Sequence, residues 1–243
     1  MAEPTATKLG ESASPPPDRN LEMLRLVSDA AHELVGPVNQ LSSLVALFVN
    51  RYRDQLDEEA ASLLGFIETA GTRASTVANG LRTYFRIMSS ECTQAPVNTK
   101  SVVEAAMTEL RSEIDASGAE FEIAPLPDVE GDTSLLIQLF QNVIHNSLKS
   151  PRSGTPLRIT ISAQHPAGKC LISIADNGIG IDPSYSESVF RAFTKLTGHS
   201  TPGAGMGLTI AKAIVAMHGG RIWVAKQTPP GTTVCIELPE AVS

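Results

Sequence analysis

The chain has 243 residues, 42% of them hydrophobic and 19% charged, which is typical of a globular protein with one large domain or two small ones. A formal net charge of −7 without a lysine–arginine cluster argues against a nucleic-acid surface. No apolar run reaches the roughly 20 residues of a membrane span, and no signal peptide opens the chain. The three scattered cysteines have neither metal-ligand nor disulfide spacing, so we expect a reducing, cytoplasmic environment.

The N-terminal third divides into a polar tail and two apolar-periodic stretches. Residues 1–19 are rich in Pro, Ser, Thr and Ala and are predicted to be a disordered tail. Within residues 20–90, apolar residues recur at steps of three and four on either side of the polar sequence RDQLDEE, which predicts two long helices in an antiparallel hairpin. The two stripes are Leu24, Val27, Ala31, Leu34, Val38, Leu41, Val45, Phe48 and Tyr52, then Leu63, Ile67, Ala70, Ala74, Val77, Leu81, Tyr84 and Met88.

A two-helix hairpin cannot bury both stripes by itself. We predict that two chains complete a dimeric four-helix bundle, and the alternative is packing against the C-terminal part of the same chain. Gly36 and Pro37 fall inside the first helix, one turn after His32. Because Pro37 has no N–H for the carbonyl of Glu33, the helix is expected to bend or loosen there.

Residues 91–97 are predicted to be a linker, and residues 98–243 alternate between helical and strand patterns. Helical periodicity covers residues 99–114, 133–150 and 207–219, and short apolar strands are expected at 121–124, 128–132, 158–164, 170–176, 221–227 and 233–239. The turn sequences PAGK and PPG favour antiparallel neighbours. The predicted fold class is therefore α + α/β, a helical hairpin followed by an α/β sandwich with helices on one face of a mixed sheet.

The stretch NVIHNSLKS places Asn142 and Asn146 on one face of a predicted helix, with Lys149 almost one turn further on. One interpretation is a pair of solvated amides. The other is a Mg²⁺ site at Asn146 beside a phosphate that Lys149 meets, because Mg²⁺ takes few protein oxygens and keeps water and phosphate as its other ligands.

The stretch DNGIG follows an apolar strand and also has two interpretations. Asp-Asn-Gly is a favourable turn sequence. Alternatively, Asp176 accepts a hydrogen bond from an exocyclic amine, and Gly178 and Gly180 allow a planar ring to approach the backbone.

The stretch GAGMGL opens a predicted helix with Gly203, Gly205 and Gly207. A glycine-rich backbone at a helix N-terminus favours phosphate binding. The Rossmann fingerprint does not apply, because this run does not directly follow a strand. A flexible lid over phosphates fits better. Phe190 and Phe193 precede it, either as core residues or as anchors of the lid.

In this order, with His32, Glu33 and Pro37 upstream, these stretches resemble the sensor histidine kinases of two-component signalling over about 220 residues. The segments FQNVIHNSLKS, DNGIGIDPSY and HGGRIWV are most similar to the bacteriophytochrome-type kinase module. The resemblance implies a dimerisation and histidine-phosphotransfer hairpin followed by an ATP-binding domain of the gyrase/Hsp90 type. It implies ATP and Mg²⁺ as cofactors, and as partners a second copy and a response regulator. These 243 residues show no sensory domain, so we expect either a fragment of a longer kinase or a kinase that receives its signal from a separate sensor protein.

The resemblance also implies a role for each motif residue. His32 would be the phosphoacceptor and Glu33 would take its proton. Asn146 would bind Mg²⁺, with Asn142 and Lys149 near the phosphates. Asp176 would contact adenine, and the glycines would line its pocket and form the lid; these are Gly178, Gly180, Gly203, Gly205 and Gly207.

The chain departs from the family pattern at several positions. Gly36 stands where many relatives use a polar residue to dephosphorylate the regulator, which predicts weak phosphatase activity. Ser147 and Ser150 stand where Ala and an aromatic residue are usual. The rival functions are a phosphotransfer or scaffold protein with a non-catalytic nucleotide domain, and an ATPase or serine-directed kinase that shares the nucleotide fold.

Overall fold

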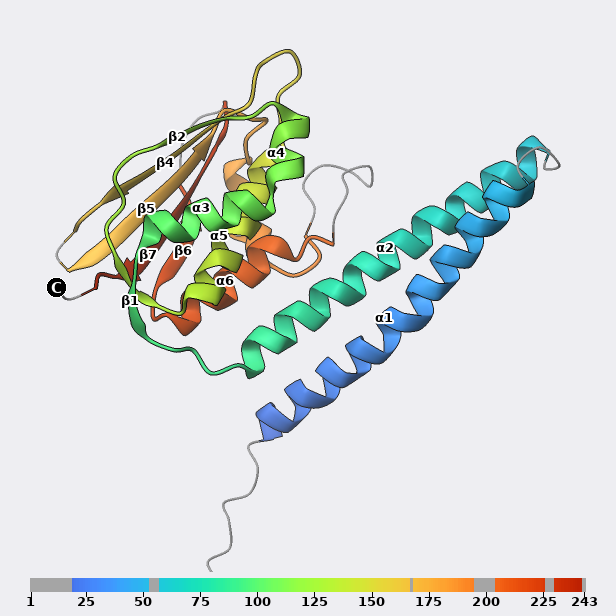
Figure 1. Cartoon of the computed structure of the whole chain (residues 1–243), viewed down its shortest axis with the longest axis horizontal. Helices are drawn as coiled ribbons and strands as arrows, with labels where there is room; N and C mark the ends of the chain where they lie inside the picture. The colour runs from blue at the N-terminus through green and yellow to red at the C-terminus, as the bar shows by residue number, and fades with distance from the viewer. Residues whose placement is uncertain (1–18, 53–56, 167, 195–203, 226–229, 242–243) are drawn as a thin grey trace, which may run out of the picture.

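The computed structural model describes residues 19–52, 57–166, 168–194, 204–225 and 230–241. They form a pair of long helices and an α/β unit, which follow one another along the chain (Figure 1). The tail predicted at residues 1–19 lies outside the described residues except for Arg19, which begins the first helix.

The two predicted long helices are present as α1 (Arg19–Tyr52) and α2 (Glu58–Ser89), which pack along each other (Figure 1). Asp57 caps α2 by accepting a hydrogen bond from the backbone N–H of Ala60 at 2.7 Å. α1 continues through Pro37 as one helix, so the proline removes a single hydrogen bond without ending the helix. Within the described ranges, no helix combines the length and hydropathy needed to cross a membrane.

The line of contact between α1 and α2 is made of small residues. A Cβ atom on Gly71 would lie 2.6 Å from Ser42 Oγ, so the helices approach closely there. Val35 and Ala78, two turns away on their respective helices, are buried as well. This line runs beside the predicted stripe of α1, in which Val38 and Val45 are half-buried while Leu41 and Phe48 are exposed.

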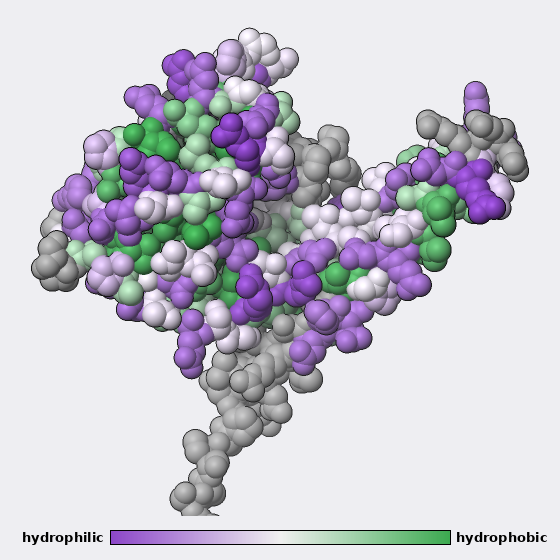
Figure 2. Space-filling model, in the orientation of Figure 1, coloured by the Kyte–Doolittle hydropathy of each residue, from purple (hydrophilic) through white to green (hydrophobic). Residues whose placement is uncertain are grey.

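The stripes are covered along only part of the hairpin. Near the loop end, large apolar side chains such as Leu41, Leu63 and Ile67 are exposed, and Figure 2 shows apolar surface towards that end. At the other end of α2, Ile87 is fully buried in the core of the α/β unit, and Leu81 and Tyr84 pack against it. The alternative predicted from the sequence, packing against the same chain, therefore applies at this end of the hairpin, and the apolar stripes stay exposed at the loop end.

The α/β unit is built on a mixed five-stranded sheet in the order β2–β4–β5–β7–β6. β2 pairs with β4 in parallel, and the other neighbours are antiparallel. The strands are β2 (Glu120–Ile123), β4 (Arg158–Gln164), β5 (Lys169–Asp176), β6 (Arg221–Val224) and β7 (Thr232–Pro239). The mixed sheet predicted from the turn sequences is thus present.

Four helices lie on one face of this sheet (Figure 1). They are α3 (Thr99–Glu109), α4 (Arg111–Ser117), α5 (Thr133–Leu148) and α6 (Gly207–Met217). Alternate residues of β5 are buried, so one face of the strand meets the helices and the other faces out. Ile161, Ile172 and Ile236 from the strands and Leu139 and Phe140 from α5 are completely buried in the resulting core.

Two local features differ from the sequence analysis. The single helix expected at residues 99–114 is broken at Leu110, whose φ of −95° and ψ of 14° are not helical, so that α3 and α4 follow one another. The segment expected to be a linker ends in β1 (Ala95–Val97), which pairs with β3 (Val129–Gly131) as a small separate sheet.

His218 ties this small sheet to the rest of the unit. Its Nδ1 lies 2.8 Å from the carbonyl oxygen of Ile214. Because a carbonyl oxygen only accepts, Nδ1 carries the hydrogen, and Nε2 accepts from the N–H of Asp132 at 3.0 Å. The Sγ atom of Cys92 lies 3.6 Å from the same Nε2. The connection between α2 and the α/β unit is therefore anchored from residue 92 onward.

Candidate nucleotide-binding and phosphoacceptor sites

The paired asparagines lie half-buried on α5, next to the N-terminus of α6. Asn142 donates from Nδ2 to the carbonyl of Gln138 at 2.8 Å. A Cβ atom on Gly207 would lie 3.3 Å from Asn142 Oδ1, so the amide oxygen faces the first residue of α6. The structure thus brings the asparagine stretch and the glycine-rich stretch together, as the sequence predicts.

Asn146 lies one turn beyond Asn142, and Lys149 is the half-buried C-cap of α5. Across the described residues there is no group of three or more His, Cys, Asp or Glu that would hold a metal by itself. A Mg²⁺ ion at Asn146 would take an amide oxygen from the protein and its remaining ligands from phosphate and water, which fits the preferences of Mg²⁺. These residues therefore suit a metal that arrives with a nucleotide.

Asp176 ends β5 as a buried carboxylate with three hydrogen-bond donors from the protein. Its Oδ1 accepts from the N–H of Gly178 at 3.0 Å and of Thr232 at 3.1 Å, and Oδ2 accepts from Ser147 Oγ at 3.0 Å. Burial raises the pKa of Asp176, and the hydrogen bonds from Gly178, Ser147 and Thr232 oppose that rise. The carboxylate is held in one orientation at the end of the strand.

The two glycines after Asp176 occupy positions that disfavour a side chain, for different reasons. A Cβ atom on Gly178 would lie 2.1 Å from the carbonyl oxygen of Ser150, which also accepts from the N–H of Ile179 at 3.0 Å. Gly180 has a φ of 81°, in the left-handed region that favours glycine. The DNGIG turn is thereby pressed against the C-terminal end of α5.

Several residues of this site escaped the sequence analysis. Ser147 and Thr232 hold Asp176, and Gly231 lies so close that its Cβ would be 1.9 Å from the carbonyl oxygen of Asp176. Asn177 accepts from the N–H of Arg158 at 2.8 Å and donates to a backbone carbonyl in the preceding loop at 2.9 Å. The sequence signals were the turn sequence PPG, which predicted a turn and no contact, and Ser147, which stands where Ala is usual in the family.

The described ends of the glycine-rich segment meet each other. Phe193 donates its N–H to the carbonyl of Gly205 at 3.1 Å, and a Cβ on Gly205, whose φ is 69°, would meet the carbonyl oxygen of Thr194 at 2.6 Å. Phe190 is a core residue, whereas Phe193 is half exposed. Gly203 lies outside the described residues, whereas Gly205 and Gly207 are described.

The structure places His32 and Glu33 on α1, both exposed, and does not bring them to the Asp176 site. α1 packs on α2, and it is α2 that contacts the α/β unit through α6. A Cβ on Gly80 of α2 would lie 2.9 Å from Met206 Cγ and 3.6 Å from Ala204 Cβ, next to Gly205. Gly36 has open space around it, so nothing in the fold requires glycine there.

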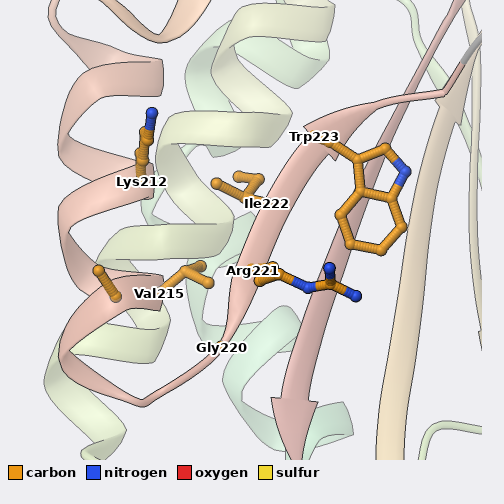
Figure 3. Close-up of a pocket in the computed structure, with 7 residues that line it drawn as sticks. Lys212, Val215, Gly220, Arg221, Ile222 and Trp223 are labelled. Carbon is orange, nitrogen blue, oxygen red and sulfur yellow. The ribbon is translucent and has the colours of Figure 1, made fainter. Parts of the chain in front are cut away.

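A separate pocket of about 390 Å³ lies between the C-terminal half of α6 and the edge strand β6 (Figure 3). Its lining is Lys212, Val215, Ala216, Gly220, Arg221, Ile222 and Trp223. The guanidinium carbon of Arg221 lies 5.8 Å from the centre of the Trp223 ring. None of the residues predicted to bind a nucleotide lines this pocket.

Comparison with known proteins agrees with this geometry. Residues 131–242 match the protein family described as histidine kinase-, DNA gyrase B- and HSP90-like ATPase. The chain is 33% identical over 221 residues to the phytochrome-like protein Cph1 of Synechocystis, covering 90% of this chain and 29% of Cph1. It is 27% identical over 223 residues to the histidine protein kinase DivJ of Caulobacter vibrioides, covering 88% and 37% of the two chains. The chain belongs to the sensor histidine kinase family.

Solved histidine kinases share its fold. Full-length ShkA in complex with AMPPNP has a TM-score of 0.64 and 25% identity, over 91% of this chain and 46% of that one. The mycobacterial sensor histidine kinase MprB has a TM-score of 0.53 and 33% identity, over 60% of this chain and 97% of that one. The α/β unit is therefore a gyrase/Hsp90-like ATP-binding domain, and this chain spans less than a third of the length of Cph1.

Proposed function

We propose that this chain is the kinase module of a sensor histidine kinase, which binds ATP with Mg²⁺ and transfers the γ-phosphoryl group to His32. The observation that carries the proposal is that two stretches, far apart in sequence, both pack against α5 and its C-terminal end. Gly207 at the start of α6 lies next to Asn142, and Asp176 and Gly178 contact Ser147 and Ser150. Such a site offers a base-binding carboxylate, amide oxygens and a helix N-terminus.

In the proposed complex the base lies at Asp176 and the phosphates lie between α5 and α6. An exocyclic amine of adenine donates to Asp176, and Gly178 and Gly180 let the ring approach the backbone. The N-terminus of α6, with Gly205 and Gly207, faces the phosphates, and the predicted lid including Gly203 closes over them. A Mg²⁺ ion bound to Asn146 and phosphate oxygens would supply charge neutralisation, with Asn142 and Lys149 nearby.

In the proposed transfer step, an imidazole nitrogen of His32 attacks the γ-phosphorus. The bond to the bridging oxygen breaks, ADP leaves with the electron pair, and the imidazole proton passes to Glu33. The exposure of His32 supports this role, since a nucleophile must be reached by ATP. The α/β unit must first move to His32. We place the hinge in residues 91–97, and the contacts of Cys92 and β1 confine it to the start of that segment.

The proposed organisation is a hairpin over residues 20–90, the linker at 91–97 and the ATP-binding domain over 98–243. Two hairpins pair through their exposed apolar stripes into a homodimeric four-helix bundle. The phosphoryl group then passes to an aspartate of a response regulator, and a separate sensor protein or domain supplies the signal. A solved complex of histidine kinase ThkA with its response regulator protein TrrA has the same fold as this chain, with a TM-score of 0.60 at 19% identity.

Gly36 and Pro37 shape the proposed chemistry at His32. The lost hydrogen bond at Pro37 loosens the helix one turn after the phosphoacceptor, so His32 can face ATP and the regulator in turn. Gly36 presents no side chain to position a hydrolytic water, so phosphatase activity towards the regulator is weak. Rapid, protein-dependent loss of phosphate from a phosphorylated regulator would contradict this part of the proposal.

The test of the kinase proposal is incubation with γ-labelled ATP and Mg²⁺. We expect acid-labile, base-stable label on the wild type and none on His32→Gln or Asn146→Asp. His165→Gln is the matched control, because His165 is an exposed histidine paired with Glu240 at 2.9 Å and should leave labelling unchanged. Label that survives acid, or that persists in His32→Gln, would refute the assignment. Nucleotide binding without any label would instead support the phosphotransfer or scaffold alternative.

A further inference from the structure

Ser147 is a buried polar residue of α5 that none of the proposed roles has used. It is 2% exposed and lies one residue after Asn146. A helical serine ordinarily points to solvent or donates to the carbonyl four residues earlier. Here its hydroxyl donates across to Asp176 Oδ2 at 3.0 Å, joining α5 to the end of β5.

The hydrogen bonds that Asp176 accepts leave one lone-pair position of its carboxylate unused. An ionised carboxylate has about four lone-pair positions, two on each oxygen. Gly178 and Thr232 fill both positions on Oδ1, and Ser147 fills one on Oδ2. One acceptor position on Oδ2 is left for a ligand, and Ser147 fixes the direction in which it points.

We propose that Ser147 is a positioning residue for the nucleotide base, and that its hydroxyl makes Asp176 select a 6-amino purine over a 6-oxo purine. The inference rests on the proposed function, in which Asp176 contacts the base. A fixed, ionised carboxylate can only accept, so it pairs with an N–H at position 6 and repels a carbonyl oxygen there. Loss of the hydroxyl frees Oδ2 to rotate and removes a donor that keeps it ionised.

The protonation state of Asp176 gives the inference a second observable. Burial raises the pKa of this carboxyl, while Ser147, Gly178 and Thr232 oppose the rise by hydrogen bonding. Without Ser147 the pKa rises further, and a protonated Asp176 becomes a donor that suits a 6-oxo base. The charged groups on the surrounding elements have other partners: His145 and Lys149 interact electrostatically with Glu113, and Arg158 and Lys169 form ion pairs with Glu120 and Glu237.

The experiment compares ADP with inosine diphosphate, which has a carbonyl in place of the amino group at position 6 and an N–H in place of the acceptor N1. Binding to the full chain is measured by titration calorimetry with Mg²⁺ at pH 6, 7 and 8. Ser147→Ala should weaken ADP binding about 5- to 10-fold, which corresponds to the net value of a typical hydrogen bond, and weaken the inosine nucleotide less than about 2-fold. The loss of ADP affinity on acidification should begin at a higher pH than in the wild type.

Two further variants separate positioning from folding. Ser147→Cys keeps the shape with a much weaker donor and should shift selectivity in the same direction. Ser173→Ala removes a hydroxyl from the other face of β5, where it lies 3.9 Å from Cys235 Sγ, and should change neither selectivity nor pH profile. The unfolding temperature without nucleotide confirms that each variant is folded.

The outcomes distinguish this inference from the proposed function. If the wild type does not bind ADP, both fail. If the wild type binds ADP and Ser147→Ala loses both nucleotides equally with an unchanged pH profile, Ser147 is merely structural. The inference is then wrong while the kinase proposal stands. If Ser147→Ala and Ser147→Cys both bind the two nucleotides as the wild type does, the inference about Ser147 is also wrong.

Discussion

The α/β unit and the loop end of the hairpin place their large apolar side chains in opposite ways. In the α/β unit, Leu136 and Phe140 of α5 are completely buried beneath the sheet. On the hairpin, Leu47 is 63% exposed and Phe66 is 71% exposed. All four belong to amphipathic helices, so the difference lies in what each helix packs against.

This difference follows from geometry. A five-stranded sheet offers a broad apolar face that covers the whole stripe of a helix. Two helices cover each other only along a line, and here that line is the close contact of Ser42 with Gly71. The α/β unit is thus complete as a folding unit, whereas the loop end of the hairpin needs another surface. The four-helix bundle of the proposed homodimer would supply it.

The largest effect on stability should come from a cavity in the core of the α/β unit. Phe140→Ala should lower the free energy of unfolding by about 3–5 kcal/mol, because it removes a fully buried aromatic side chain. Phe193→Ala is the control, since Phe193 is half exposed and should cost little. Urea unfolding followed by circular dichroism measures both, and equal losses would show that burial does not distinguish the two sites.

The next largest effect should come from a charge on the exposed stripe. Leu63→Glu places a carboxylate on the proposed dimer surface and should weaken association at least about 100-fold, because the charge is buried without a partner. Sedimentation equilibrium measures the association constant directly. The secondary structure of the monomer should be retained.

Ala61→Glu is the matched control for this charge. Ala61 is exposed on the same helix, two residues before Leu63, and therefore faces nearly the opposite side. It should leave association unchanged. If both variants dissociate the chain equally, or if neither does, the exposed stripe is not the dimer surface.

The same comparison explains how much of the fold the sequence could predict. Long periodic stretches predicted α1, α2, α5 and the longer strands, because helical and strand patterns differ in period. The break at Leu110 was missed, since apolar residues continue at helical spacing on both sides of it. The pairing of β1 with β3 was missed because three-residue strands carry too little pattern.

The candidate site shows the same limit at the level of single residues. Asp176 and Gly178 were predicted because a carboxylate and glycines at a strand end have an evident chemical use. Ser147 and Thr232 were not, because their contacts with Asp176 join residues 29 and 56 positions away in the sequence. Ser147 was noted as a departure from the family pattern, but neither it nor a threonine at the start of a strand indicates a distant partner in its local sequence. Only the folded arrangement of α5, β5 and β7 reveals them.

The smallest predicted effect on stability is at Asp176, the residue proposed to bind the base. Asp176→Asn removes a buried charge, while the amide can still accept from Gly178 and Thr232 and donate to Ser147. Burial raises the pKa of Asp176 in the folded state above its pKa in the unfolded state. At a pH between these two values, the native state therefore binds more protons than the unfolded state. The wild type should therefore lose stability relative to Asp176→Asn as the pH rises through this window.

The expected difference is about 1.4 kcal/mol for each unit by which the two pKa values of Asp176 differ. This difference in stability is absent at a pH below the pKa of Asp176 in the unfolded state and complete at a pH above its pKa in the folded state. Urea unfolding between pH 3.5 and 8 measures the stability, and titration with ADP should show that the more stable variant has lost its nucleotide affinity. A wild type that gains stability relative to Asp176→Asn on the same rise in pH would mean that hydrogen bonding outweighs burial at this carboxylate. The α/β unit, complete as a fold, would then carry no energetic cost at the residue proposed to bind the base.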